Sequence, residues 1–569
     1  MAESQAVFLR HPLLSLCLFG FFAYGLTLSF ASLTYFDDYF FLLDWAEFNN
    51  DLANVIHAFR EDAFHKQQGG SYYRPLLTIS WIFDAQISGT DLWMYRVTNL
   101  ALHLAAISLL FRLLVVSGHT APRSLVLAAL FAVHPALTQA VAWIPGRNDS
   151  LLALFLLGSF LMLIRYVRST RPLDLAAHLL LLLAAFLAKE SAVLFPPIAL
   201  MYILLNGKQR PWLRTVVIIA GWLLAFSVWW SLRMSAAIAA PPIESFPSIG
   251  QIVNILVAYF GKVVWPFSLS VKPVAADLSL MPGVVGIVAF FFLARMSSSV
   301  HWKGILLGWV WFIVLLVPTF SWHPANPYPM KFYEHRLYVP LVGLLLAVAS
   351  LEPPRWLLRE GMKPLLVTVV LFVFLVGTIS HSLTFRNGLS FWENAARTSP
   401  NDETNRNRIS MMQFPATLAA KLPPDPQRWS DRSALTNLER DLSNQLKETR
   451  SADLLQSLAV ISFGLGYLQT SEERFLEAKE LDPSSPEISY NLGVLYYRAG
   501  LLQKAEKEWN ATLAKNNRHA EAMSNLCYLF YKQKRYLEAI ERCEQAQRLG
   551  GQVSRELISE LRSLVGRDL

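Results

Sequence analysis

Long apolar runs fill the first two thirds of the chain. They occur near 12–33, 96–117, 122–142, 150–167, 173–189, 191–206, 212–233, 281–296, 302–320, 336–351 and 363–385. About 20 apolar residues in a helix cross the hydrocarbon core of a bilayer, and several of these runs are shorter than that. The pattern predicts an all-α fold whose first domain, residues 1–385, is a polytopic bundle of about 11 membrane spans.

Residues 386–569 are polar and helical in composition, and they contain an internal repeat of 34 residues. Equivalent positions begin at Ala452, Pro486 and Ala520. This period is typical of tetratricopeptide repeats, in which each helix pair buries its apolar face against its neighbours. Trp392, Ala395 and Pro400 fit the second helix of a further repeat, so we expect 386–569 to be a soluble helical solenoid, interrupted over 401–451.

Charge places the two domains relative to the membrane. Hydrophobic residues make up 54% of the chain and charged residues only 16%, whereas soluble proteins are about a quarter charged. Alternate connections are basic, which predicts a cytoplasmic N-terminus and, after an odd number of spans, an extracytoplasmic repeat domain. The net charge of +8 follows from these loops and does not indicate nucleic-acid binding. We expect a bacterial inner membrane with periplasmic repeats, or an endoplasmic reticulum membrane with lumenal repeats in a eukaryote.

Two adjacent acids, Asp37 and Asp38, follow the first apolar run, and the topology places them on the outer side with the loop 35–95. They fit an ordinary solvated pair at a helix end. They also fit a general base whose pKa is raised by partial burial and by its neighbour. If a metal is used at all, they are the candidates for holding a divalent cation through oxygen ligands.

Further charged residues stand beside the outer ends of apolar runs. Such residues are costly near lipid and are functional by default, although ion pairing among themselves is the common alternative. The cations are Arg74, Arg147, Lys189 and Arg336, and their polar neighbours are Asp149, Glu190 and His335. If the cations converge, a phosphate group is the natural ligand.

Three other features leave two interpretations each. His134 is expected to be a hydrogen-bonded core histidine, with a role in the site as the alternative. The amphipathic run from Gln251 to Val271 fits either an interfacial helix or a packing helix. Cys527 and Cys543 fit either a disulfide in an oxidising compartment or two buried thiols.

The chain has no phosphate-cradling glycine loop, no zinc-type cysteine–histidine spacing and no nucleophile-elbow serine. Three cysteines also exclude a disulfide-rich scaffold. Soluble nucleotide-driven chemistry is therefore not expected, no cofactor is predicted with certainty, and any donor substrate should come from the membrane.

An ordered set of motifs resembles the transmembrane and tetratricopeptide-repeat-containing (TMTC-like) proteins, which belong with the protein O-mannosyltransferases to the GT-C glycosyltransferases. The motifs are Phe36-Asp37-Asp38, Tyr73-Arg74-Pro75-Leu76, His134-Pro135, Ala140-Val141-Ala142-Trp143-Ile144, Gly146-Arg147, Lys189-Glu190, Trp265-Pro266, Arg336-Leu337-Tyr338-Val339-Pro340 and Arg386-Asn387 with Trp392. The repeat array is short for this family, and Asn148 stands where a small residue is common.

The resemblance implies transfer of a sugar from a polyprenyl-phosphate donor to a Ser or Thr hydroxyl of an extracytoplasmic protein, with inversion at the anomeric carbon. It implies that Asp37 is the base, that Asp38 supports it or orients the acceptor, and that Arg74, Arg147, Lys189 and Arg336 hold the leaving phosphate. Supporting roles fall to Tyr73, His134, Asp149, Glu190, His335 and Tyr338. The repeats would present the acceptor protein.

Two other functions remain open on the sequence. The same membrane domain would suit a transferase acting on a lipid or polysaccharide, for which a peptide-binding repeat array is superfluous. A non-enzymatic scaffold or a transporter is the second. A transporter should show internal pseudo-symmetry between its halves, and the sequence has no clear repeat of that kind.

Overall fold

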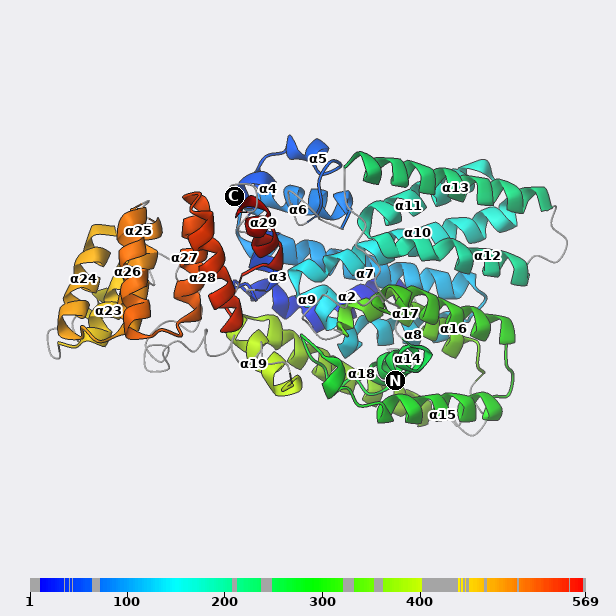
Figure 1. Ribbon diagram of the computed structural model, residues 1–569. Helices are drawn as coiled ribbons and strands as arrows, with labels where there is room; N and C mark the ends of the chain where they lie inside the picture. Colours follow the sequence, from blue (N-terminus) through cyan, green and yellow to red (C-terminus); the bar gives the residue numbers. More distant parts are fainter. Residues whose placement is uncertain are drawn as a thin grey trace. The chain divides into compact units, whose positions relative to one another are not determined.

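The computed structural model describes residues 11–34, 36–39, 41–42, 45–63, 72–206, 212–236, 248–320, 332–352, 362–401 and most of 439–565 (Figure 1). Within these ranges the chain is almost entirely helical. It divides into two compact units, residues 1–413 and 414–569. The predicted all-α class is confirmed.

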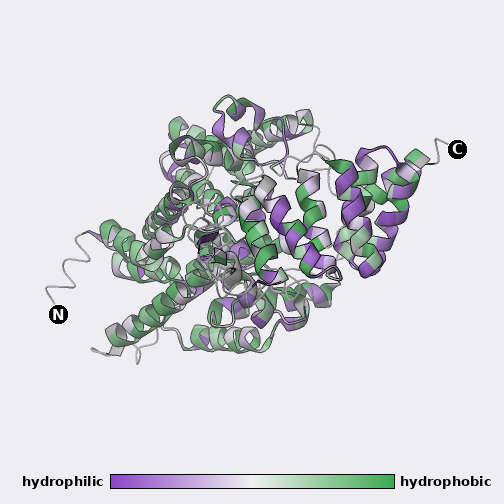
Figure 2. Ribbon diagram, turned by 90° about the vertical axis from the view of Figure 1, so that its left-hand side faces the viewer, coloured by the Kyte–Doolittle hydropathy of each residue, from purple (hydrophilic) through white to green (hydrophobic). Residues whose placement is uncertain are grey.

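The membrane unit begins with α2 (Pro12–Tyr24) and ends with α19 (Gly388–Thr398). Its other long helices are α6 (Pro75–Ser88), α7 (Leu92–Val116), α8 (Ala121–Ala132), α10 (Arg147–Ser169), α11 (Pro172–Ala188), α12 (Phe195–Asn206), α13 (Trp212–Ser235), α14 (Ile249–Val264), α15 (Met281–Met296), α16 (Trp302–Leu316), α17 (Tyr338–Ala349) and α18 (Met362–Ser382). Short elements between them carry the polar residues of the outer loops. In Figure 2 the helices of this unit are mostly hydrophobic along their lengths.

Six helical segments of the described chain are long and apolar enough to cross a membrane, and a bent pair makes up to seven. The bend of 54° separates α8 from the segment Pro135–Ala142. Other helices at predicted runs, such as α11 and α15, are apolar but shorter. The protein is therefore an integral membrane protein, while the predicted count of about 11 spans stays a prediction.

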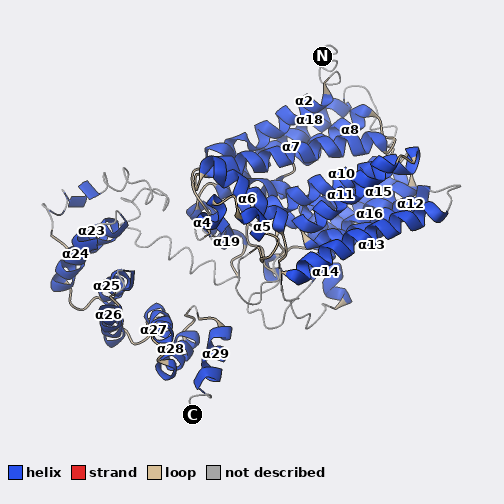
Figure 3. Cartoon of the chain, turned by 90° about the horizontal axis from the view of Figure 1, so that it is seen from above, coloured by secondary structure: helices blue, strands red, loops and turns tan. Residues whose placement is uncertain are grey.

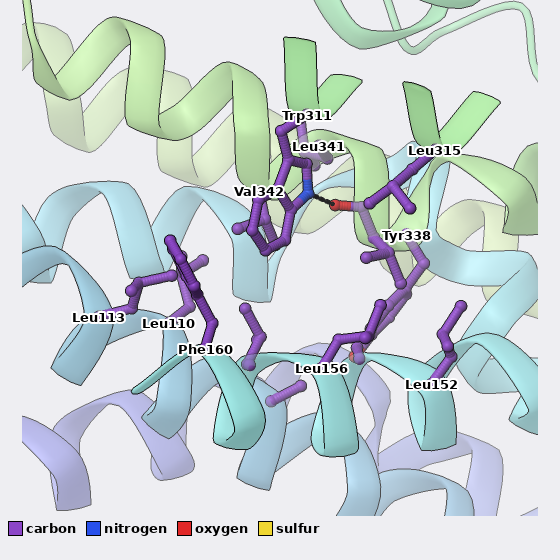
Figure 4. Close-up of a cluster of buried hydrophobic side chains, with 14 of the residues drawn as sticks. Leu110, Leu113, Leu152, Leu156, Phe160, Trp311, Leu315, Tyr338, Leu341 and Val342 are labelled. Atoms are coloured by element: carbon purple, nitrogen blue, oxygen red, sulfur yellow. Dashed lines mark hydrogen bonds between the residues drawn. The ribbon is translucent and has the colours of Figure 1, made fainter. Parts of the chain in front are cut away.

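The core of the membrane unit lies where α10, α16 and α17 meet (Figure 4). Phe160, Trp311 and Tyr338 are buried there among leucines. The indole Nε1 of Trp311 donates to the Val339 carbonyl at 2.9 Å, so the ring is satisfied as well as packed. The backbones of α16 and α17 approach closely at Gly308, where a Cβ would lie 2.3 Å from the Gly343 oxygen. This contact explains why small residues are needed at the crossing.

Helix α19, which lies in the segment predicted to begin the repeats at residue 386, belongs to the membrane unit. Trp392 and Ala395 are buried with Trp143, Val271 and Phe385 in one apolar cluster. The Asn394 side chain also accepts a hydrogen bond from the Val271 backbone N–H at 3.1 Å. Helix α19 therefore packs with the bundle, and the boundary between units lies at 413/414.

The second unit stacks helix pairs, as the 34-residue period predicts. The helices are α23 (Ala452–Gly464), α24 (Leu468–Leu481), α25 (Pro486–Arg498), α26 (Leu502–Lys515), α27 (Ala520–Lys532), α28 (Tyr536–Arg548) and α29 (Arg555–Val565). The two helices of each of the first three pairs pack against each other, successive pairs pack together in chain order, and α29 packs on α28 (Figure 3). Cys527 on α27 and Cys543 on α28 form a disulfide, which decides between the two interpretations.

Candidate active site

Asp38 stabilises the loop that follows the first span, residues 36–39, which we call the acid loop. Its carboxylate is buried and accepts hydrogen bonds from the Thr34 N–H at 2.6 Å, the Thr34 hydroxyl at 2.9 Å and the Phe36 N–H at 3.1 Å. Burial raises the pKa of Asp38, and the bonds from Thr34 and Phe36 oppose that shift. Both carboxylate oxygens are thus used by the loop itself, so Asp38 supports the loop rather than facing a substrate.

Asp37 is fixed in place by the residue before it. The Phe36 ring stacks on Trp143 at 5.7 Å and contacts Tyr333, Phe391 and Trp392 at 5.7 to 6.4 Å. The short helix α3 (Asp37–Tyr39) lies against η4 (Ile144–Gly146). Asp37 itself is half-buried. The aromatic contacts therefore bring the acid loop to the N-terminal ends of α10 and α17.

Two polar residues of α7, which sequence analysis missed, clamp this loop to the bundle. Arg96 is buried and donates to the carbonyls of Phe30, Ser32 and Ala142 at 2.8 to 3.0 Å. Asn99 donates to the carbonyl of Val141 at 3.1 Å. Their signal in the sequence is weak, because both sit at the start of an apolar run where polar residues are common.

The structure corrects the predicted role of Arg147. Its side chain is 0% exposed and forms an ion pair with Asp84 at 2.5 Å. Its other donors go to the Asn99 carboxamide oxygen, the Ser80 hydroxyl and the Tyr95 carbonyl, at 2.6 to 3.2 Å. Every nitrogen of the guanidinium therefore has a protein partner and none faces solvent. Arg147 ties α10 to α6 and α7, and it is not placed to bind a phosphate.

The burial of this pair predicts a large effect on stability. Arg147→Gln should lower the free energy of unfolding by about 3–5 kcal/mol, because it leaves the Asp84 charge buried without its partner. Arg165→Gln is the matched control on the same helix, since Arg165 pairs with Asp174 at 3.3 Å but is 56% exposed. An exposed pair is worth only about 0–1 kcal/mol. Thermal unfolding of the detergent-solubilised protein measures both. Equal losses would contradict a structural role for Arg147.

Two of the remaining predicted cations each form an ion pair with a carboxylate from another segment of the chain. Arg74 contacts Glu190, with Nη2 at 3.0 Å from the carboxylate and Nε also at 3.0 Å. Lys189 contacts Asp149 at 2.7 Å and donates to Asn148 at 3.1 Å. Ion pairing among these charged residues, the alternative given by the sequence, is therefore present, although Lys189 and Glu190 each pair with a residue of another segment. The side chains of Arg74 and Lys189 are 12% and 14% exposed, so both reach the surface of the site.

The third cation, Arg336, completes a cluster with Arg74, Lys189 and His335. Burial and the nearby charges of Arg74 and Arg336 lower the pKa of Lys189, while Asp149 opposes the shift. Burial lowers the pKa of His335 well below its usual value, and Lys189, Arg336 and Arg74 add to the effect. Arg74 pairs with Glu190, the residue after Lys189, and His335 is adjacent to Arg336, so the four groups form two adjacent pairs whose charges act on each other. We call Arg74, Lys189, His335 and Arg336 the cation cluster.

The cation cluster and the acid loop share one region of the molecule. The His335 ring stacks on Tyr333 at 5.3 Å and contacts Trp143 at 5.8 Å, the two rings that also contact Phe36. The Arg336 guanidinium lies 5.5 Å from the centre of the Tyr333 ring. His335 Nδ1 is buried and has no hydrogen-bond partner in the described chain. An acceptor from a ligand would satisfy that nitrogen if it carries the proton.

A buried carboxylate missed by sequence analysis, Glu334, anchors this segment. It pairs with Lys262 of α14 at 2.7 Å and with His381 of α18 at 3.4 Å. It also accepts the Ser270 N–H at 2.7 Å, and its own N–H donates to Gln139 at 3.0 Å. Glu334 is next to His335 in η8 (Glu334–Leu337), so these bonds fix the position of the cluster. The run from Gln251 accordingly forms α14, a helix whose inner face packs on the bundle.

The other predicted supporting residues are structural. His134 is buried, with Nε2 at 3.0 Å from the Val263 carbonyl and Nδ1 at 3.3 Å from the Ala136 N–H. The Tyr73 hydroxyl donates to the Phe59 carbonyl at 3.0 Å, and the Tyr338 hydroxyl bonds His103 at 2.7 Å. The core role expected for His134 is the one the structure gives it. In the described part of the chain, no three His, Cys, Asp or Glu side chains come together in a way that could hold a metal ion.

The fold and site define a class of protein: an integral membrane protein with acidic and basic residues at one end of its bundle and a tetratricopeptide-repeat unit. A family profile described as dolichyl-phosphate-mannose-protein mannosyltransferase matches residues 75–232. A tetratricopeptide-repeat profile matches residues 463–516 and 490–553. The first match includes Lys189 and Glu190 and begins after Asp37 and Arg74.

The chain is similar to proteins named protein O-mannosyl-transferase. It is 36% identical over 116 residues to tmtc2 of Xenopus laevis, covering 20% of this chain and 14% of that protein. It is 31% identical over 180 residues to TMTC1 of Homo sapiens, covering 29% and 20%. The matched region thus spans a fifth or less of the length of these relatives. The resemblance to TMTC-like proteins predicted from the motifs is confirmed.

Proposed function

We propose that the protein is a membrane glycosyltransferase that moves a sugar from a polyprenyl-phosphate donor to a Ser or Thr hydroxyl of a protein. The observation that carries the proposal is the position of the acid loop next to the cation cluster. A base and a group of phosphate-binding cations are the two parts that this transfer needs. The names of the similar proteins support the same class of activity.

In the proposed reaction, Asp37 takes the proton from the acceptor hydroxyl as its oxygen bonds to the anomeric carbon of the sugar. The bond between that carbon and the phosphate oxygen breaks at the same time, and the electron pair leaves with the lipid phosphate. A single displacement inverts the anomeric centre. A phosphate is already a good leaving group, so its oxygen needs no acid, and the cation cluster stabilises the charge that it gains.

The charges of the cluster suit this role. Arg74 and Lys189 are held in place by Glu190 and Asp149, and the Arg336 guanidinium lies over the Tyr333 ring. A phosphate would share Arg74 and Lys189 with their carboxylates and would also interact with Arg336. One carboxylate oxygen of Asp149 has no hydrogen-bond partner in the described chain. The Lys189–Asp149 pair therefore does not use all the hydrogen-bonding capacity of its carboxylate.

The disulfide supports an extracytoplasmic position for the repeats, because disulfides persist in oxidising compartments. We therefore expect the native protein, alkylated under denaturing conditions without reductant, to gain one label, at Cys17, the free cysteine. After reduction it should gain three, since Cys527 and Cys543 are then released. Mass spectrometry counts the labels. Three labels before reduction would contradict the bridge and would remove this support for the topology.

We assign the binding of the acceptor protein to the repeat unit. Stacked helix pairs form an extended binding surface for peptides, which a lipid or polysaccharide acceptor would not need. Deleting the residues after 413, where the membrane unit ends, should therefore lower sugar transfer to protein.

The test is sugar transfer in membranes supplied with a radiolabelled polyprenyl-phosphate sugar, using a panel of sugars. We expect label in the protein fraction, released by treatment that cleaves O-linked sugars. Label only in lipid or polysaccharide would replace the proposed acceptor by the first alternative. No transfer from any donor of the panel would favour a non-enzymatic scaffold.

A further inference from the structure

A large cavity in the described membrane unit lies at the opposite end of the bundle from the acid loop. It has a volume of about 1730 Å³ and is enclosed by α2, α8, α16, α17 and α18. Helix α10 measures the separation: Arg147 stands at its outer end and Arg168, which lines the cavity, near its inner end. At 1.5 Å per residue the two lie about 30 Å apart, which is the thickness of the hydrocarbon core. The cavity is therefore distinct from the proposed donor site.

The walls of the cavity are apolar, and the cavity opens on the side of the helix bundle. Leu16 and Phe19 of α2, Leu125 of α8 and Leu371 of α18 line it. Two further lining residues, Phe22 and Phe372, are 69% and 63% exposed, although both belong to helices apolar enough to cross a membrane. Exposed aromatic side chains at such depth face acyl chains, so the opening communicates with the bilayer and not with water.

The inner end of the same cavity is basic. Arg123, Arg168, Lys303, His119 and His301 line it together with a single carboxylate, Glu352. Arg123 pairs with Glu352 at 2.9 Å. Arg168 and Lys303 instead donate to the backbone carbonyls of Val116 and Leu205, each at 2.7 Å. Neither has a carboxylate within ion-pair distance among the described residues, so two positive charges at this end lack an anion.

We infer that this cavity binds an anionic glycerophospholipid, with its acyl chains along the apolar walls and its phosphate between Arg168 and Lys303. A free phosphate or sugar phosphate would satisfy the two cations but would leave the apolar volume and its lateral opening unused. Basic pockets between helices at the cytoplasmic side suit anionic lipid head groups. A bound lipid would bridge α2, α10 and α16, whose ends meet there.

The experiment is native mass spectrometry of the full-length, delipidated protein in detergent with defined lipids added. We expect one phosphatidylglycerol to bind, and phosphatidylcholine with the same acyl chains to bind at least tenfold more weakly. Glycerol 1-phosphate at the same concentration should not compete. Equal binding of the two lipids, or displacement of phosphatidylglycerol by glycerol 1-phosphate, would overturn the inference. These binding measurements need only the wild-type protein.

A matched pair of double variants locates the site. Arg168→Gln with Lys303→Gln should weaken phosphatidylglycerol binding at least tenfold. Arg171→Gln with Arg295→Gln removes the same charge from exposed residues on the same predicted side, outside the cavity, and should leave binding unchanged. If both double variants bind as the wild type does, the lipid sits elsewhere. If both lose binding equally, the overall basic surface attracts it and the cavity does not.

Discussion

Replacing Asp37 by asparagine should lower sugar transfer by about 10²- to 10⁴-fold while leaving the protein folded. The asparagine amide keeps the shape of the side chain but cannot take up the proton of the acceptor hydroxyl. General base catalysis contributes about this factor to the reaction rate. The Phe36 contacts that hold the loop are untouched by the change. Initial rates of label transfer from the radiolabelled donor, at matched expression, measure the effect.

Two controls separate catalysis from folding. Asp51→Asn changes another acid of the same outer loop, exposed and bonded to the Ala53 N–H at 2.9 Å, and should keep the wild-type rate. Asp38→Asn should lower thermal stability as well as activity, because the buried Asp38 carboxylate accepts three hydrogen bonds from the loop. Equal rates for Asp37→Asn and the wild type would remove Asp37 as the base.

The helices were predictable because apolar length is a local property. The run near 281–296 coincides with α15, and the run near 122–142 corresponds to α8 and the segment that follows it. The break at His134-Pro135 reflects proline, which lacks the N–H needed to continue a helix and restricts the residue before it. In contrast, α6 lies within the segment predicted as the outer loop 35–95, since a half-polar helix of this length has no clear signal.

The site was predictable as a set of residues but not as a network. Arg74, Lys189 and Arg336 were expected at one end of the bundle, and the charges of Arg74 and Arg336 lower the pKa of Lys189. Which carboxylate pairs with which cation depends on tertiary contacts: Arg147 meets Asp84 because α6 packs near α10, and Lys262 meets Glu334 across 72 residues of sequence. No local pattern encodes those distances, so Arg147 resembled a ligand residue until its partners were known.

Arg336 provides the sharpest test of the cation cluster, since it lies over the Tyr333 ring that also contacts Phe36 of the acid loop. Arg336→Gln should lower kcat about 10²- to 10³-fold, the usual cost of removing one preorganised group that stabilises developing charge. Arg336→Lys should recover part of that loss, because it restores the charge without the planar fork. Steady-state kinetics with varied donor concentration separate kcat from KM.

Kinetic and stability measurements on Arg336→Gln distinguish a role in the chemical step from a role in donor binding and from a structural role. Arg397→Gln, which removes an exposed arginine from the last turn of α19, should match the wild type. Loss of stability in Arg336→Gln equal to that of Arg147→Gln would make Arg336 a structural residue too. A rise in KM with unchanged kcat would mean that Arg336 holds the donor equally in its ground and transition states. The proposed role requires the fall in kcat, because the phosphate gains its charge only as the bond to the sugar breaks.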